Sequence, residues 1–178
     1  MNTSQRGQLV LAIDELLCTD PERAAALAND VPTWVLDQYK AAAQQVYARI
    51  PAVAASTDST VSSSTLSQAP GWVRLNVLDT IVGWSAGHGQ VCVHQPHPSR
   101  PQPVVAAAWK PGLVACGHCT HLLRIKSGSI ADRTCDGCGS VDPHDGLYPT
   151  TVTVGPLIYS LGVCQTCRWW DETSIRAA

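Results

Sequence analysis

The spacing of cysteines in the second half of the chain constrains its fold more than any other feature. This part of the sequence contains one C-x-H pair and three C-x-x-C pairs: Cys92/His94, Cys116/Cys119, Cys135/Cys138 and Cys164/Cys167. A two-residue gap within a tight turn lets two thiolates converge on one metal ion, and zinc prefers four such ligands in a tetrahedron. The eight ligands are therefore enough for two closed zinc sites, which leaves Cys18 as the only cysteine outside them.

The composition indicates a folded chain with a modest core. Of its 178 residues 45% are hydrophobic and 15% charged, but there is no Phe and only one Met. Core packing therefore depends on Val, Leu, Ala and six Trp residues. Small cores of this kind often need metals or cross-links for stability, which agrees with the cysteine pattern.

The N-terminal sequence does not resemble an export signal. Its apolar run "LVLAIDELL" contains Asp14 and Glu15, whereas the hydrophobic region of a signal is uncharged. No stretch approaches the roughly 18 to 20 apolar residues that cross a bilayer. We therefore expect a cytoplasmic protein without a membrane segment. In a reducing compartment, paired cysteines are more often metal ligands or redox groups than structural disulfides.

Residues 1–51 are predicted to be a helical segment. The apolar residues of "LVLAIDELL" recur at helical spacing, and Asp20 followed by Pro21 is typical of an N-cap and first position of a second helix. A third helix is expected to begin near Thr33 and to end at Pro51. This segment is predicted to contain helices only.

A linker and a β-rich domain are predicted after the helices. Residues 52–70 are rich in Ser, Thr and Ala, as flexible linkers are. The run "GWVRLNVLDTIVGW" predicts a fourth helix that packs either on the cysteine-rich part or on the N-terminal helices. Beyond residue 90, six short apolar runs predict strands: "QVCVH", "VVAAAW", "GLVAC", "HLLRI", "TVTV" and "LIYSLGV". The expected fold class is α+β, with a small β-rich zinc domain within residues 71–178.

The two central cysteine pairs, "CGHC" and "CDGC", are separated by fifteen residues. Gly139, just after the second pair, suits the positive φ that such turns often need. This C-x₂-C-x₁₅-C-x₂-C pattern, over residues 113–141, resembles the zinc-ribbon and rubredoxin-like knuckle superfamily. The resemblance implies a metal-binding architecture and no particular activity, because that superfamily includes nucleic-acid binders, parts of the transcription and translation machinery, and purely structural inserts.

The spacing favours a nested division of the ligands. In this division the two central pairs bind one ion, while Cys92, His94, Cys164 and Cys167 bind the other. A sequential division, with the first two pairs on one ion and the last two on the other, remains open, as does an interleaved one. His94 is the least secure ligand, because His88 and His97 lie close enough in sequence to replace it.

Catalysis is not expected from these ligands. Catalytic zinc usually keeps an open position beside a carboxylate or histidine that moves protons, whereas these ligands close both sites and no Glu lies between Glu22 and Glu172. The zinc-deaminase signature, hydrolase elbows and phosphate-binding loops are absent, and a redox C-x-x-C ordinarily occurs singly at a helix N-terminus. We expect no small-molecule substrate. Zinc is favoured over iron, which a Cys₄ site would also accept.

The charge distribution favours a protein partner over a nucleic acid. The net charge is −2, and no basic face stands out in the sequence. We therefore expect a non-catalytic binding module or assembly component, with nucleic-acid binding as the alternative. Six residues around the cysteine pairs are candidates for contacts with either partner: Arg124, Lys126, Arg133, Arg168, Trp169 and Trp170.

Overall fold

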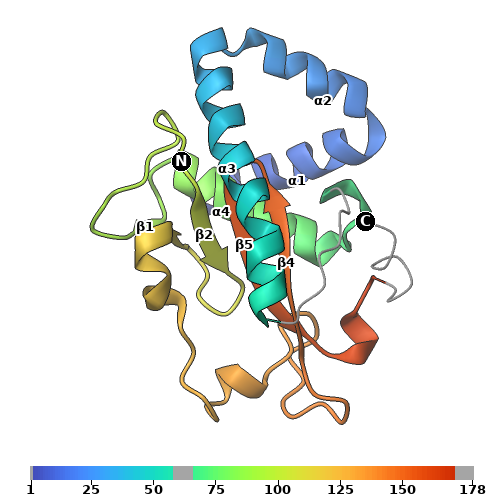
Figure 1. Cartoon of the computed structure of the whole chain (residues 1–178). Coiled ribbons are helices and arrows are strands. Elements are labelled where there is room, and N and C mark those ends of the chain that lie inside the picture. The colour runs from blue at the N-terminus through green and yellow to red at the C-terminus, as the bar shows by residue number, and fades with distance from the viewer. Residues whose placement is uncertain (1, 58–65, 171–178) are drawn as a thin grey trace.

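A mixed β-sheet lies at the centre of the protein (Figure 1). The structure is a computed structural model and describes residues 2–57 and 66–170. Its strands are β1 (Gln90–Val91), β2 (Val104–Ala107), β3 (Leu113–Cys116), β4 (Tyr148–Val154) and β5 (Leu157–Val163). Their order across the sheet is β1-β3-β2-β5-β4.

Strands β3 and β5 lie on either side of β2 and run in opposite directions. β2 pairs antiparallel with β3 and parallel with β5. Val104 of β2 is opposite both Cys116, the last residue of β3, and Leu157, the first residue of β5. The carboxyl ends of β3 and β5 therefore lie at opposite ends of the sheet.

One face of the sheet packs on helix α4 (Gly71–Ser85). Alternate residues of β5 point to this face and are buried, as the two-residue period of a strand requires. Val73, Val77 and Trp84 of α4 belong to the same core. Trp84 also donates its indole N–H to the carbonyl of Pro96 at 2.8 Å, which ties the loop after β1 to the helix.

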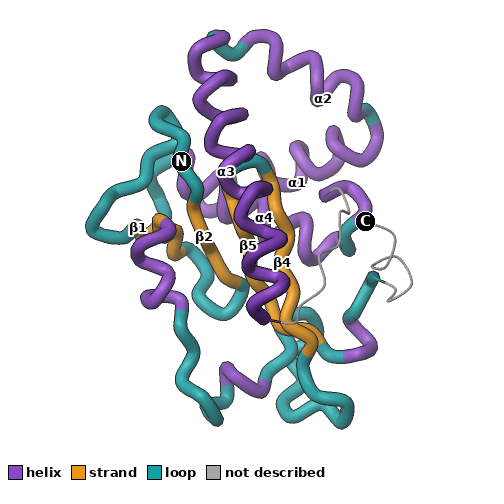
Figure 2. The backbone as a smooth tube through the Cα atoms, in the orientation of Figure 1, coloured by secondary structure: helices purple, strands orange, loops and turns teal. Residues whose placement is uncertain are grey.

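The other helices are α1 (Thr3–Thr19), α2 (Pro21–Leu27) and α3 (Thr33–Thr57). In Figure 1 the second half of α3 passes in front of the sheet, and α4 lies behind it. Among residues 33–50 of α3, Ala42 and Val46 are buried. Figure 2 shows the chain of α1, α2 and the start of α3 extending beyond the end of the sheet. We call these three helices the helical arch.

Helix α4 contacts both the sheet and α1, which answers the question that the sequence left open. Arg6 of α1 donates from Nε to the Asp79 carboxylate at 2.5 Å and from its guanidinium to the Asp79 carbonyl at 2.9 Å. Arg74 of α4 donates to the Asp14 carboxylate at 2.6 and 3.1 Å. The predicted α+β class is confirmed, with one helix shared by both parts.

Two local predictions were wrong. Helix α3 continues through Pro51 to Thr57, because proline removes a single backbone bond while the following Ala-rich residues keep a high helix propensity. The run "HLLRI" is not a strand, since residues 117–123 form a 3₁₀ helix, η3.

Residues 58–65 of the predicted linker lie outside the described residues. Asp20 does cap α2, accepting from the Arg23 N–H at 3.0 Å.

Among the described residues, no helix combines the length and apolar character that crossing a membrane requires.

A largely buried ion pair and an exposed one lead to a stability prediction. The side chains of Arg74 and Asp14 are 19% and 16% exposed, against 44% and 56% for Arg133 and Asp142. We expect D14N to lower the free energy of unfolding by about 1–3 kcal/mol, because it leaves a largely buried guanidinium without its charged partner.

The matched control is D142N, for which we expect a change below about 0.5 kcal/mol. Asn also tolerates the positive φ of 52° at this position. Urea unfolding of both variants measures the difference, and equal effects of D14N and D142N would contradict the assignment.

Candidate metal centres

The eight predicted ligands lie in two groups of four. The first centre consists of Cys92, His94, Cys116 and Cys119, and the second of Cys135, Cys138, Cys164 and Cys167. Within each group the ligand atoms lie within 4.8 Å of one another. Zinc–sulfur bonds of about 2.3 Å in a tetrahedron place two sulfurs about 3.8 Å apart. Both donor sets therefore fit a tetrahedral metal ion.

The nested division that the ribbon spacing favoured is wrong, and the sequential division is the one found. Cys116 and Leu157 lie at the same position along the strand direction, since both pair with Val104 of β2. Cys164 follows seven positions after Leu157 along β5, which at about 3.3 Å per residue is about 23 Å away. The fifteen residues between the central pairs do not form a ribbon hairpin, because they run from one end of the sheet to the other.

The first centre forms where β1 and β3 end side by side. The two strands are parallel, with Val91 opposite Val114, so Cys92 and Cys116 follow at the same end. The N–H of Cys116 donates to Sγ of Cys92 at 3.4 Å. The 3₁₀ helix η3 then turns the chain so that Cys119 points back to the same place.

His94 completes the first centre. Its Nδ1 lies 3.2 Å from Sγ of Cys119 and 3.4 Å from Sγ of Cys116. These separations approach the value of about 3.6 Å expected for nitrogen and sulfur ligands on one zinc ion. His97 instead bonds through Nδ1 to the Ser99 hydroxyl at 2.7 Å, and His88 lines a separate surface hollow beside Arg6. Neither residue takes the place of His94.

The second centre forms at the carboxyl end of β5. Cys164 directly follows this strand, and the 3₁₀ helix η5 (Gln165–Cys167) carries the next ligand. The other pair lies in the turn between Thr134 and Val141, which a β-bridge closes. Sγ of Cys138 lies 3.8 Å from Sγ of Cys164, which matches a tetrahedral edge.

Hydrogen bonds dock this turn on β5 independently of a metal. The N–H of Asp136 donates to the Gly162 carbonyl at 2.9 Å, and the Gly162 N–H donates to the Asp136 carboxylate at 2.7 Å. Burial raises the pKa of Asp136. The end of the strand and the ligand turn are thus held in register by the backbone as well as by the centre.

The two centres are built in the same way. In each, a strand leads into a cysteine and a 3₁₀ turn that carries the second cysteine, as in "LVACGHC" and "LGVCQTC". The backbone angles at Cys116 (φ −73°, ψ 168°) and Cys164 (φ −75°, ψ 169°) are nearly identical. The Cys164 N–H donates to Sγ of Cys135 at 3.3 Å, as the Cys116 N–H does to Cys92. Our reading of the sequence missed this repeat, although the strand-like run before each pair indicated it.

The thiols within each metal-free centre differ in acidity. Burial raises the pKa of Cys92 and Cys135, but hydrogen bonds, led by those from the N–H groups of Cys116 and Cys164, outweigh it and lower both pKa values to about 7. Burial and the neighbouring sulfurs raise the pKa of Cys119 to about 11, and the same causes raise that of Cys167. Each metal-free centre therefore contains one thiol with a lowered pKa and one with a raised pKa, and metal binding must displace the proton of the second.

A glycine and two tryptophans enclose one side of the second centre. A Cβ on Gly137 would lie 2.9 Å from the Trp72 ring and 3.0 Å from Sγ of Cys167, so a larger residue does not fit there. Trp72 meets Trp169 edge to face at 6.2 Å between ring centres. Gly139 has φ 72°, as the sequence predicted for this turn.

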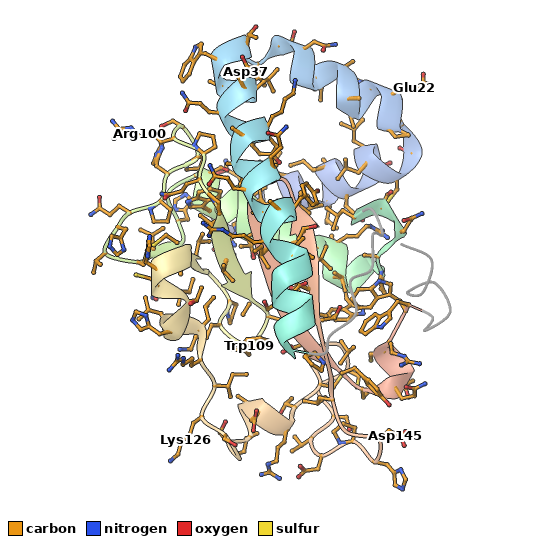
Figure 3. The ribbon with its side chains drawn as sticks, in the orientation of Figure 1. Glu22, Asp37, Arg100, Trp109, Lys126 and Asp145 are labelled. Atoms are coloured by element: carbon orange, nitrogen blue, oxygen red, sulfur yellow. The ribbon has the colours of Figure 1, made fainter. Side chains whose placement is uncertain are left out.

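The six predicted partner contacts have different surroundings. Arg133 is paired with Asp142, and the Arg168 guanidinium lies over the Tyr148 ring at 4.9 Å. Trp169 and Trp170 are half-buried against the core. Arg124 and Lys126 are exposed, and Figure 3 shows Lys126 on a loop well away from the sheet.

No protein-family model, curated protein or solved structure matches this chain. The zinc-ribbon resemblance therefore reduces to what the geometry shows, which is two knuckle-like centres suited to metal ions. Each ligand set is closed and contains no carboxylate among the described residues. Glu172 lies outside the described residues.

The geometry predicts two zinc ions per chain. Native mass spectrometry of the purified protein is expected to show both, and H94A is expected to lower the zinc content toward one because three ligands bind more weakly than four. H97A is the matched control and is expected to retain two ions. Loss of zinc from H97A but not from H94A would contradict the assignment.

Crowding at Gly137 generates a further prediction. G137A is expected to lower the free energy of unfolding by about 1–3 kcal/mol, since its methyl group would overlap Trp72 and Cys167. The control is G7A in α1, where nothing lies within 4 Å of the added methyl group. That change is expected to stabilise the protein by about 0.5–1 kcal/mol through helix propensity. Thermal unfolding of the zinc-loaded variants tests both, and a neutral G137A would contradict the crowding.

Proposed function

We propose that this chain is a non-catalytic, zinc-stabilised module that binds another protein through its helical arch. The metal centres would supply stability and position, and the helices would supply the contact surface. The observation that carries the proposal is the number of large apolar side chains exposed on the arch.

The metal centres support a structural role because of what they connect. The first ties the two-residue strand β1 to β3, and the second ties the turn at 134–141 to the end of β5. Two-residue strands and long irregular loops have little stability of their own. Zinc binds both Cys₃His and Cys₄ donor sets. Iron–sulfur sites usually have cysteine ligands only, and the second centre alone offers such a set.

The helical arch exposes apolar side chains that a soluble monomer usually buries. Six of them are 40–59% exposed: Leu9, Leu11, Leu27, Trp34, Tyr39 and Tyr47. Helix α2 contains no buried residue. The three aromatic residues alone leave roughly 300 Å² accessible, taking about 200 Å² for each full side chain. On monomeric proteins, apolar patches of a few hundred Å² are often functional.

A nucleic-acid partner has less support. Of the candidate contacts, Arg133 is paired with Asp142 and Arg168 lies on Tyr148. The tryptophans that could stack on bases pack on the core instead. A zinc-bound Cys₄ set adds about two negative charges and a Cys₃His set about one, which further weakens phosphate binding.

Affinity capture with a matched pair of variants tests the proposal. Immobilised full-length protein is expected to retain a partner protein from the native cell extract, and L27S/W34S is expected to lose it because both side chains lie on the arch. V93S is the control, since Val93 is 87% exposed but lies beside the first metal centre.

Nuclease treatment is expected to leave this retention unchanged. Retention that nuclease abolishes, that falls steeply between low and moderate salt and that survives L27S/W34S would contradict a protein partner and favour nucleic acid.

A further inference from the structure

The two metal centres differ in the ligand that faces solvent. In the first centre the exposed ligand is His94, while Cys92, Cys116 and Cys119 are only 3%, 3% and 5% exposed. In the second centre the exposed ligand is a thiol, that of Cys138. Cys135 and Cys164 are buried, and Cys167 is half-buried.

This difference decides which centre an oxidant can attack. Peroxides react with accessible thiolates, and metal binding keeps a cysteine in the thiolate form. The exposed imidazole of His94 does not undergo this chemistry, and the three cysteines of the first centre are buried. Cys138 is therefore the ligand sulfur that solvent-borne peroxide reaches first.

A second thiolate is in place to trap the oxidised sulfur. Sγ of Cys164 lies 3.8 Å from Sγ of Cys138, so a movement of about 1.8 Å brings the two sulfurs to disulfide distance. The geometry thus supplies both an attacking and a resolving residue.

We propose that Cys138 is a peroxide-reactive site and that its oxidation releases the metal from the second centre alone. The inference rests on the proposed metal loading of both centres. The Cys138 thiolate attacks hydrogen peroxide, and the O–O bond breaks. Hydroxide is the leaving group, and Cys138 becomes a sulfenic acid. The Cys164 thiolate then attacks that sulfur, the S–O bond breaks, a second hydroxide leaves, and the disulfide forms. Two thiolates lose two electrons in total, and one peroxide gains them.

The metal is released because the ion keeps only two of its four ligands. The new disulfide, however, joins the same two segments that the metal joined, namely the turn at 134–141 and the end of β5. The hydrogen bonds between Asp136 and Gly162 also remain. The oxidised protein therefore keeps its fold while it releases one zinc ion, and a thiol reductant with added zinc restores the original state.

Cys18 must be excluded as a source of the signal. It is exposed in α1 and belongs to neither ligand group, so its oxidation would release no metal. The experiment therefore uses full-length, zinc-loaded C18S protein. Hydrogen peroxide is added in slight excess, and zinc release is followed with a chromogenic chelator.

We expect one equivalent of zinc to be released, with a mass lower by two hydrogen atoms and a Cys138–Cys164 disulfide in the peptide map. C138H replaces the exposed thiolate by an imidazole, as in the first centre, and is expected to slow this release at least ~10-fold. H94C makes the reverse exchange and is expected to make the first centre release its zinc as well.

The outcomes separate the two proposals. Fewer than two zinc ions before oxidation would contradict the metal loading on which the proposed function depends. Two bound ions that leave together, or a disulfide between other cysteines, would overturn the assignment of Cys138. If C138H fails to bind the second zinc ion, H94C still tests the proposal. A first centre that keeps its zinc under peroxide in H94C would contradict the idea that an exposed thiolate ligand makes a centre sensitive to oxidation.

Discussion

The opposite directions of β3 and β5, set by their shared neighbour β2, determine where both metal centres form. Each of these strands leads directly into a ligand cysteine, so the direction of the strand decides the end of the sheet at which its centre lies. The loop that joins η3 to the turn at 134–141 must then cross the length of the sheet. The irregular outline of the lower part of Figure 1 follows from this constraint.

The core explains why metal ions are useful in this position. Its fully buried side chains are mainly Val and Leu, and no Phe is available to fill it. Such a core can support the central strands and α4, but β1 contributes only two residues to the sheet. Four-ligand metal sites can contribute folding free energy directly. We infer that the ends of the sheet depend on the centres, while its middle depends on apolar packing.

Much of this arrangement could be predicted from the sequence, and the reasons for success and failure are physical. The ligand types and their count followed from local spacing, because two cysteines in one turn converge whatever the rest of the fold does. The choice of partners between turns did not, since it depends on whether β3 and β5 are parallel. The C-x₁₅-C spacing suggested a short hairpin, but Leu123 is buried and η3 replaces the expected strand. The position of α4 was likewise unpredictable, because its apolar residues surround the helix and fit two neighbours at once.

The distance along the chain between paired ligands has a consequence for the loops. Cys92 and Cys116 are 24 positions apart, and Cys135 and Cys164 are 29 apart. The entropic cost of closing a flexible loop rises only slowly, by about 0.6 kcal/mol for each doubling of its length. Insertions or substitutions within 98–103 or 143–146, which lie inside these two loops, would therefore change the shape of the exposed loops at little energetic cost while the ligands stay in place. The two metal centres thus separate the part of the chain that must stay constant from the part that can diversify.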